Sequence, residues 1–150
     1  MIITDAKESK NIDNLISKKY KIPSNIRMEV AGLEAFKLIN SYFKPKKALI
    51  IIGTGNNGGD GLVLARYMFI NNISCDIFMM ENSKKTSVDF KNNKKIVEKL
   101  NINFVKSLNK NKISKYDLIV DAIFGIGLNR DIQIKTPIYK IIKLINKSKK

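Results

Sequence analysis

The sequence contains no histidine and only one cysteine, Cys75, among its 150 residues. Histidine is the side chain whose ordinary pKa lies nearest to neutrality, so its absence excludes Ser-His and Cys-His nucleophile pairs and most zinc sites. Any proton transfer must therefore use Asp, Glu, Lys, Tyr or water. The single cysteine excludes a disulfide within the chain and is typical of a reducing compartment, so we expect a cytoplasmic protein. Because Cys75 falls in an apolar stretch, we predict a buried, unreactive thiol.

Long apolar runs are also missing. None approaches the roughly 20 residues that a membrane-spanning helix needs. A charged residue, Asp5, follows the first apolar residues at once, so no signal peptide is visible. We therefore expect no membrane partner. The length suits one domain that spans residues 1–150 and buries a sizeable core.

Acidic residues are scarce, because 13 Asp and Glu stand against 28 Lys and Arg and give a net charge of +15. Such a charge suggests nucleic acid as a partner. However, 25 of the basic residues are lysines spread along the chain, and the 25 isoleucines and 17 asparagines beside them indicate the codon bias of an AT-rich genome. Specific nucleic-acid sites favour arginine and aromatic platforms. We therefore do not expect nucleic acid as the main partner, although the charge would help to recruit a phosphate-bearing ligand.

The sequence does contain a regular alternation of predicted helices and strands. Apolar patterns predict strands over 48–52, 74–79, 102–105 and 118–124, and helices over 5–19, 25–42, 59–70, 87–100 and 138–146. The first helix is predicted to begin with a capping box, in which Asp5 is the N-cap and Glu8 follows three residues later. The main strands are near-continuous apolar runs, which is typical of parallel sheets covered on both faces. The fold class that follows is α/β, with a doubly wound, Rossmann-like and mostly parallel sheet preceded by two N-terminal helices.

The most informative segment is a glycine-rich loop between the first predicted strand and the helix over 59–70. Residues 53–61 read GTGNNGGDG and hold five of the eight glycines. Glycines permit positive φ and let backbone N–H groups approach an anion, and a helix N-terminus adds unpaired donors and a favourable dipole. The loop lacks the Gly-Lys-Ser/Thr of a P-loop, and its G-x-G-x-x-G pattern alone is a weak signal. The arrangement predicts a phosphate-binding site.

Two aspartates stand out near the ends of strands. Asp60, at the predicted helix start, is expected either to cap the helix or to accept hydrogen bonds from the sugar hydroxyls of a ligand. Asp121 interrupts an apolar strand near its C-terminal end, where a buried carboxylate is costly unless it is paired or bound to a cation. With no histidine, that cation would be a hard ion with oxygen ligands such as the Asn57 amide. The alternative is that Asp121 accepts backbone N–H groups of the loop at Gly125.

A second glycine-bearing loop over 125–131 reads GIGLNRD. In a doubly wound sheet, ligands bind beyond the carboxyl ends of the strands, and both loops are predicted there. Arg130 is one of only three arginines and is suited to pair with phosphate. The alternative interpretation is a plain solvated loop.

Together these segments resemble the NAD(P)H-hydrate epimerase family, also called the YjeF N-terminal domain. The resemblance is carried by GTGNNGGDG at 53–61, by VDAIFGIGL at 120–128, and by the leading segments IPS at 22–24 and MEVAG at 28–32. It covers nearly the whole chain. It implies an isomerase that interconverts the R and S forms of hydrated NADH and NADPH, a repair step that feeds a separate dehydratase.

The resemblance also implies a set of site residues. Hydrated NAD(P)H is the implied substrate. It would be held by Asn56, Asn57, Gly58, Gly59 and Asp60 in the first loop and by Gly125, Ile126, Gly127, Leu128, Asn129, Arg130 and Asp131 in the second. One potassium ion per subunit would be bound by Asn57 and Asp121. We assign proton transfer to the carboxylate of Asp60, a role that needs no histidine.

The chain departs from the family pattern at two places. Val30 stands where the family usually has the asparagine of Met-Glu-Asn-Ala-Gly, so a hydrogen-bonded contact to a ligand or partner is expected to be lost. The family continues past the position of Lys150 into a strand with an Asp-x-Pro-Ser-Gly element. We therefore expect a partial domain that lacks its C-terminal strands, and an exposed edge strand that pairs with a second chain in a homodimer. The alternative function is a non-catalytic scaffold of the same fold that binds nucleotide or RNA.

Overall fold

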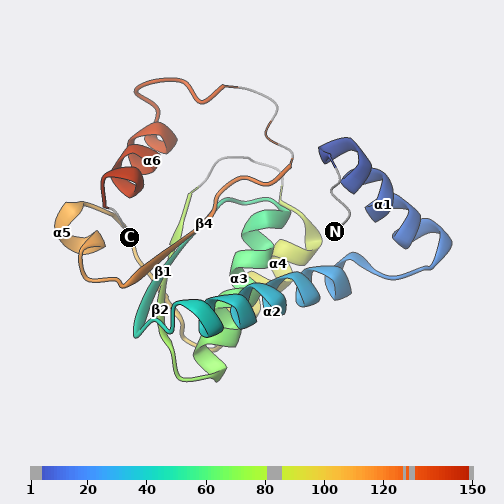
Figure 1. The fold of residues 1–150 in the computed structure, drawn as a ribbon, viewed down its shortest axis with the longest axis horizontal. Coiled ribbons are helices and arrows are strands. Elements are labelled where there is room, and N and C mark those ends of the chain that lie inside the picture. The colour runs from blue at the N-terminus through green and yellow to red at the C-terminus, as the bar shows by residue number, and fades with distance from the viewer. Residues whose placement is uncertain (1–4, 81–85, 127, 129–130, 149–150) are drawn as a thin grey trace.

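The structure is a computed structural model that describes residues 5–80, 86–126, 128 and 131–148. Figure 1 shows a central sheet with helices around it. In chain order the elements are α1 (Ala6–Lys19), α2 (Ser24–Tyr42), β1 (Lys47–Ile52), α3 (Asn56–Ile70), β2 (Ser74–Met79), α4 (Val88–Lys99), β3 (Asn103–Phe104), α5 (Lys110–Ile113), β4 (Leu118–Ala122) and α6 (Pro137–Ser148).

The four strands form one parallel sheet in the order β3-β2-β1-β4. β1 lies between β2 and β4, and its last residue, Ile52, is level with Met79 and Ala122. The pairing continues for one more residue, because the Gly53 N–H donates to the Ala122 carbonyl at 3.1 Å. This register brings the carboxyl ends of three strands to one edge of the sheet, which is where ligands bind in such folds.

Helices cover both faces of the sheet (Figure 1). The core on one face joins β1 to α2, α3 and α4, and the core on the other face joins it to α5 and α6. Successive residues of β1 serve the two cores in turn: Ile50 and Ile52 belong to the first, and Leu49 and Ile51 to the second. All four are fully buried. A strand that is apolar at every position needs cover on both sides, and the predicted doubly wound α/β sheet with two leading helices is confirmed.

The predicted helix and strand ends mostly agree with the structure. Asp5 caps α1 as predicted, because its side chain accepts the Glu8 N–H at 2.7 Å while the Glu8 carboxylate accepts the Asp5 N–H at 2.9 Å. The largest difference is at α3, which begins at Asn56 and not near residue 59. Three glycines in its first six residues lower helix propensity, so the first turn was predicted as loop. The short α5 was missed because four residues cannot display a helical period.

Cys75 is less buried than the sequence predicts, although its thiol has the expected unreactive character. The side chain is half-buried, and its thiol donates to the Ala65 carbonyl at 3.5 Å. Burial, and to a lesser degree the charge of Asp76, raises the pKa of the Cys75 thiol to about 11. The nucleophilic thiolate is therefore suppressed at neutral pH. In the described part of the chain, no helix is long and apolar enough to cross a membrane.

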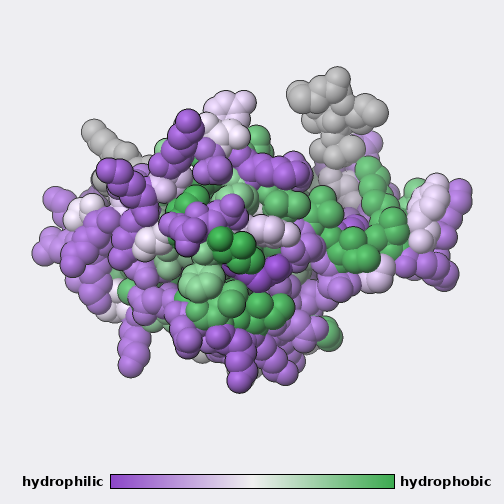
Figure 2. Space-filling model, turned by 90° about the horizontal axis from the view of Figure 1, so that it is seen from below, coloured by the Kyte–Doolittle hydropathy of each residue, from purple (hydrophilic) through white to green (hydrophobic). Residues whose placement is uncertain are grey.

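The exposed apolar residues near the amino edge of the sheet lie away from the two glycine loops. Figure 2 views the molecule from below and shows hydrophobic side chains near the centre of a mostly hydrophilic face. Phe43, after α2, and Phe69 and Ile70, at the end of α3, are exposed by 66%, 46% and 58%. Both helices lead into the amino ends of strands, so these side chains lie opposite the edge that carries the loops.

Candidate functional site

The first wall of the candidate site is the junction of β1 and α3. β1 ends at Ile52, and α3 begins at Asn56. The N-cap residue is Gly55, which has no side chain to cap the N–H groups of the first turn. A helix N-terminus offers backbone donors and the positive end of the helix dipole to an anion. The local geometry therefore suits the phosphate group that the sequence predicts.

The glycines of this junction are required by close packing. A Cβ at Gly58 would overlap the carbonyl of Gly53, and a Cβ at Gly61 would lie 2.9 Å from the side chains of Ala122 and Ile52. None of the glycines that the structure describes has a positive φ. These residues therefore do not use the positive φ that glycine permits. The glycines let the helix start press directly against the strand ends.

The second wall is the segment that follows β4, and it meets the first as predicted. The side-chain amide of Asn57 donates to the Phe124 carbonyl at 2.9 Å. A Cβ at Gly125 would lie 3.2 Å from the Cβ of Asn57, so the two segments are in contact. Residues 67 positions apart in the chain thus share the carboxyl edge of the sheet. Because the amide nitrogen faces Phe124, the amide oxygen of Asn57 remains available to a ligand or cation.

Asp121 differs from its predicted environment. It lies in β4 but is exposed, so the prediction that this carboxylate is buried is wrong. Its Oδ1 accepts the backbone N–H of Ile123 at 3.0 Å. This contact resembles the predicted alternative, although the donor precedes the Gly125 loop. The carboxylate stands at the same sheet edge as Asn57, and the two supply the oxygen ligands that a hard cation prefers. Among the described residues, no three acidic or Cys side chains gather as a metal cluster.

Asp60 is half-buried and is the fifth residue of α3. Because the helix N-cap is Gly55, the alternative that Asp60 caps the helix is wrong. Burial raises the pKa of Asp60 to about 6, with a smaller contribution from the negative charge of Asp13 on α1. A carboxyl group with a pKa near the working pH can both give and take a proton. This is the chemistry that the absence of histidine leaves to a carboxylate.

The rest of the second loop is described only in part. Gly127, Asn129 and Arg130, which the sequence assigns to ligand binding, lie outside the described residues. Ile126 and Leu128 are exposed by 61% and 43%, and Asp131 is exposed as well. A cavity of about 260 Å³ adjoins the loop, and its walls are Phe124, Leu128, Asp131, Ile132, Gln133, Thr136 and Ile138.

Sequence reasoning missed several residues that border this region. Gln133 and Thr136 line the cavity. The Thr136 hydroxyl also accepts the Tyr139 N–H at 3.2 Å, and a threonine before Pro137 at a helix start is a recognisable signal for that role. Asp13 has no such signal, because only the tertiary structure brings α1 near Asp60. An ion pair of 3.4 Å between Arg27 and Asp13 joins α1 to α2.

Comparison with known proteins decides the family. The sequence model described as YjeF-related protein N-terminus matches residues 24–150. The chain belongs to this family. The YjeF-related chain is 35% identical over 149 residues to the NAD(P)H-hydrate epimerase of Oenococcus oeni, covering 98% of this chain and 69% of that protein. The NAD(P)H-hydrate epimerase of Levilactobacillus brevis is 35% identical over 126 residues, which are 83% of this chain and 58% of that protein.

Two further matches define what the YjeF-related chain shares with larger proteins. It is 34% identical over 138 residues to the bifunctional NAD(P)H-hydrate repair enzyme Nnr of Moorella thermoacetica, covering 85% of this chain but 26% of that protein. The crystal structure of yeast ynu0, YNL200c, matches 99% of this chain and 66% of that chain, with a TM-score of 0.82 and 24% identity. The match to the yeast structure shows the fold alone. The names of the relatives support the epimerase interpretation and do not favour a non-catalytic scaffold.

Proposed function

We propose that this chain acts on hydrated NAD(P)H as an NAD(P)H-hydrate epimerase, an isomerase of nucleotide repair. The observation that carries the proposal is the junction of the two predicted loops: Asn57 donates to Phe124, and Asp60 lies one turn further along α3. The named relatives are NAD(P)H-hydrate epimerases and repair enzymes. The chain spans 69% of the first of these and 26% of the bifunctional one.

The residues of the first loop bind the nucleotide. The backbone N–H groups of the first turn of α3, which begins with Asn56 and Asn57, bind a phosphate oxygen of the diphosphate. Gly58 and Gly59 let the helix start pack closely on Gly53 and Met28, and this packing sets the position of the first-turn N–H groups. The second loop, Gly125–Asp131, closes the other side, with Arg130 pairing to phosphate. The adjoining cavity beside Gln133 and Thr136 receives part of the nucleotide.

Asp60 moves the proton. Protonated Asp60 gives its proton to the hydroxyl group on the hydrated carbon of the nicotinamide ring, and that hydroxyl leaves as water. The electron pair of the broken C–O bond leaves with the water, and the resulting ring cation is stabilised by the Asp60 carboxylate. Water then adds to the opposite face and returns a proton to Asp60, which restores the enzyme and yields the other epimer.

Potassium fits the oxygen ligands at this edge. The Asn57 amide oxygen and the Asp121 carboxylate would hold the ion, and its charge would help to neutralise the bound diphosphate. Because Asp121 is exposed, we expect its replacement by asparagine to weaken potassium activation without loss of stability.

The direct test follows one epimer of NADPH hydrate by chromatography as it approaches the epimer mixture at equilibrium. We expect the protein to accelerate this approach, more in potassium than in sodium salts, and Asp60→Asn to abolish the acceleration. If the epimers approached equilibrium no faster with folded wild-type protein than without it, the proposal would be refuted. Equal rates in both salts would refute the potassium assignment alone.

Assembly and location are part of the same proposal. β4 is the last strand in the sheet order, so one of its sides is open in the described part of the structure. We propose that this edge pairs with a second copy in a homodimer, which light scattering of the purified protein would test. A cytoplasmic location is proposed from the single, unreactive thiol.

A further inference from the structure

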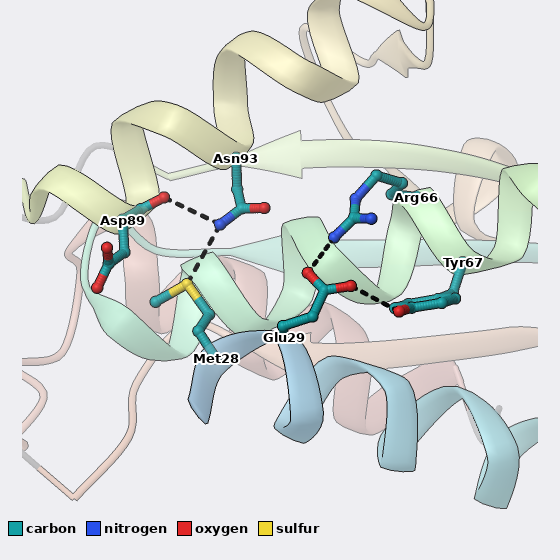
Figure 3. A network of polar contacts seen from close by, with 6 residues as sticks. All are labelled: Met28, Glu29, Arg66, Tyr67, Asp89 and Asn93. Carbon is teal, nitrogen blue, oxygen red and sulfur yellow. Dashed lines mark hydrogen bonds and ion pairs between the residues drawn. The ribbon is translucent and has the colours of Figure 1, made fainter. Parts of the chain in front are cut away.

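A polar network behind the first wall joins three helices (Figure 3). Glu29 in the first third of α2 accepts hydrogen bonds from Arg66 and Tyr67 in the last third of α3, which fixes these parts of the two helices against each other. Nearer the site, Met28 on α2 lies beside Asn93 on α4. Met28 also lies directly against Gly59 of the first loop.

Met28 packs directly behind the start of α3. It is 5% exposed, and a Cβ at Gly59 would lie 2.5 Å from its Cε and 2.6 Å from its Sδ. The thioether therefore rests on the backbone of Gly59, whose N–H makes an early bond of the helix to the Gly55 carbonyl at 3.1 Å. A methionine side chain has three rotatable bonds and does not hold one position unaided.

Asn93 supplies the constraint on Met28. Its side-chain nitrogen donates to the Met28 sulfur at 3.4 Å and to the Asp89 carbonyl at 3.0 Å. Asn93 is 8% exposed, and a thioether is a weak acceptor. Because the hydrogen bond to the Met28 sulfur is weak, burying the Asn93 amide contributes little to the stability of the protein. A leucine of similar size would suit the apolar surroundings better. The hydroxyl of Ser24 donates to the Asp89 carboxylate, which ties the start of α2 to the same turn of α4.

We propose that Met28 and Asn93 are positioning residues of the nucleotide site. Asn93 holds the Met28 thioether against Gly59, and this contact fixes the first turns of α3, which carry Asn57 and Asp60, relative to the second loop. The inference rests on the proposed function, because it assigns the contact to the ligand-binding end of α3. A positioning role differs from a packing role in one measurable respect. When the Asn93 amide is removed, the melting temperature should stay equal or rise while ligand affinity falls.

The test compares Asn93→Leu with Asn92→Leu, the same change one residue earlier on the exposed side of α4. In the ligand-free protein, we expect hydrogen exchange at the amides of residues 59–61 to be several-fold faster in Asn93→Leu, with a melting temperature equal to or above that of wild type. Asn92→Leu should leave exchange unchanged. ADP-ribose is the ligand probe, and we expect Asn93→Leu to bind it roughly fivefold more weakly than wild type and Asn92→Leu to bind it equally.

The possible outcomes separate the two proposals. Unchanged exchange in Asn93→Leu would overturn the positioning role, and so would faster exchange with unaltered ADP-ribose affinity. A variant that loses affinity only in proportion to lost stability would show that Asn93 acts through packing alone, which also overturns it. Val97→Ala, which opens a cavity in the same helix, provides the reference for pure destabilisation. Failure of wild-type protein to bind ADP-ribose would count against the proposed function, whereas the exchange measurement stands without a ligand.

Discussion

At the scale of single residues, the glycines of the first loop differ in what they tolerate. Gly58 faces the carbonyl of Gly53, whereas nothing lies within 4 Å of a Cβ placed on Gly55. Both occur in the same short segment, and the sequence alone treats them alike. Their different surroundings make them a matched pair for mutation.

We expect Gly58→Ala to lower the free energy of unfolding by roughly 2–3 kcal/mol and to abolish nucleotide binding, because the new methyl group displaces the helix start from Gly53. Gly55→Ala should cost about 0.5 kcal/mol, since only an N-cap preference is lost. Urea unfolding and titration with ADP-ribose measure the two effects. Equal losses in both variants would contradict the steric explanation.

The raised pKa of Asp60 predicts that its ionised carboxylate destabilises the folded protein near neutral pH. Its pKa is raised from 3.8 to about 6 in the folded protein, so the native state binds this proton more tightly than the unfolded chain does. The stability that comes from this group is complete below about pH 4 and is lost as the pH rises through about 6. We expect Asp60→Asn to be more stable than wild type by on the order of 1 kcal/mol at about pH 7.5, although it is inactive. The difference should vanish near pH 4, and a variant less stable than wild type at both values would contradict the assignment.

At the scale of elements, one buried carboxylate links several strands at the amino edge of the sheet. Asp76 on β2 is 8% exposed. It accepts hydrogen bonds from Asn103 at 2.8 Å and from Tyr116 at 2.7 Å, and it forms an ion pair with Lys47 at 3.1 Å. Burial raises the pKa of Asp76, but these hydrogen bonds and the charge of Lys47 outweigh it and hold the pKa below its ordinary value. One side chain thus joins three strands at the edge opposite the candidate site.

We expect Asp76→Ala to lower the free energy of unfolding by about 2 kcal/mol, because it leaves the buried Tyr116 hydroxyl and the Asn103 amide without their acceptor. Since its pKa is lowered, the contribution of Asp76 is present above about pH 4 and fades as the pH falls further. Glu98→Ala removes an exposed partner of Lys94 on α4 and should cost less than about 0.5 kcal/mol. Urea unfolding of both variants provides the test, and ADP-ribose affinity at 25 °C should be unchanged in each.

At the scale of the whole molecule, the net charge of +15 attracts any polyanion. The lysines are spread along the chain, so we expect RNA binding to be weak, to fall steeply between about 0.05 and 0.2 M salt, and to be indifferent to Gly58→Ala. Filter binding measures this. RNA affinity that survives about 0.2 M salt and depends on the first loop would instead favour a nucleic-acid site there.

The sequence predicts those features of the fold and site that depend on residues close together in the chain, and it misses those that depend on residues far apart. The apolar run at 48–52 must be buried on both sides, so the parallel sheet and its helices followed from local pattern. The capping box at Asp5 is likewise local, and it was predicted correctly. The start of α3 was not, because in that turn close packing against Gly53 and Ala122 outweighs the low helix propensity of glycine.

The sequence by itself determined the α/β fold, the family and the two segments that form the candidate site, because these depend on apolar periodicity and on residue types at fixed spacing. Only the tertiary structure decided that Asp121 is exposed, that Asp60 lies half-buried near Asp13, and that Asn93 on α4 reaches Met28 behind Gly59. Burial and pKa depend on neighbours that are distant in the chain. Such neighbours leave no periodic trace, and packing alone brings them together.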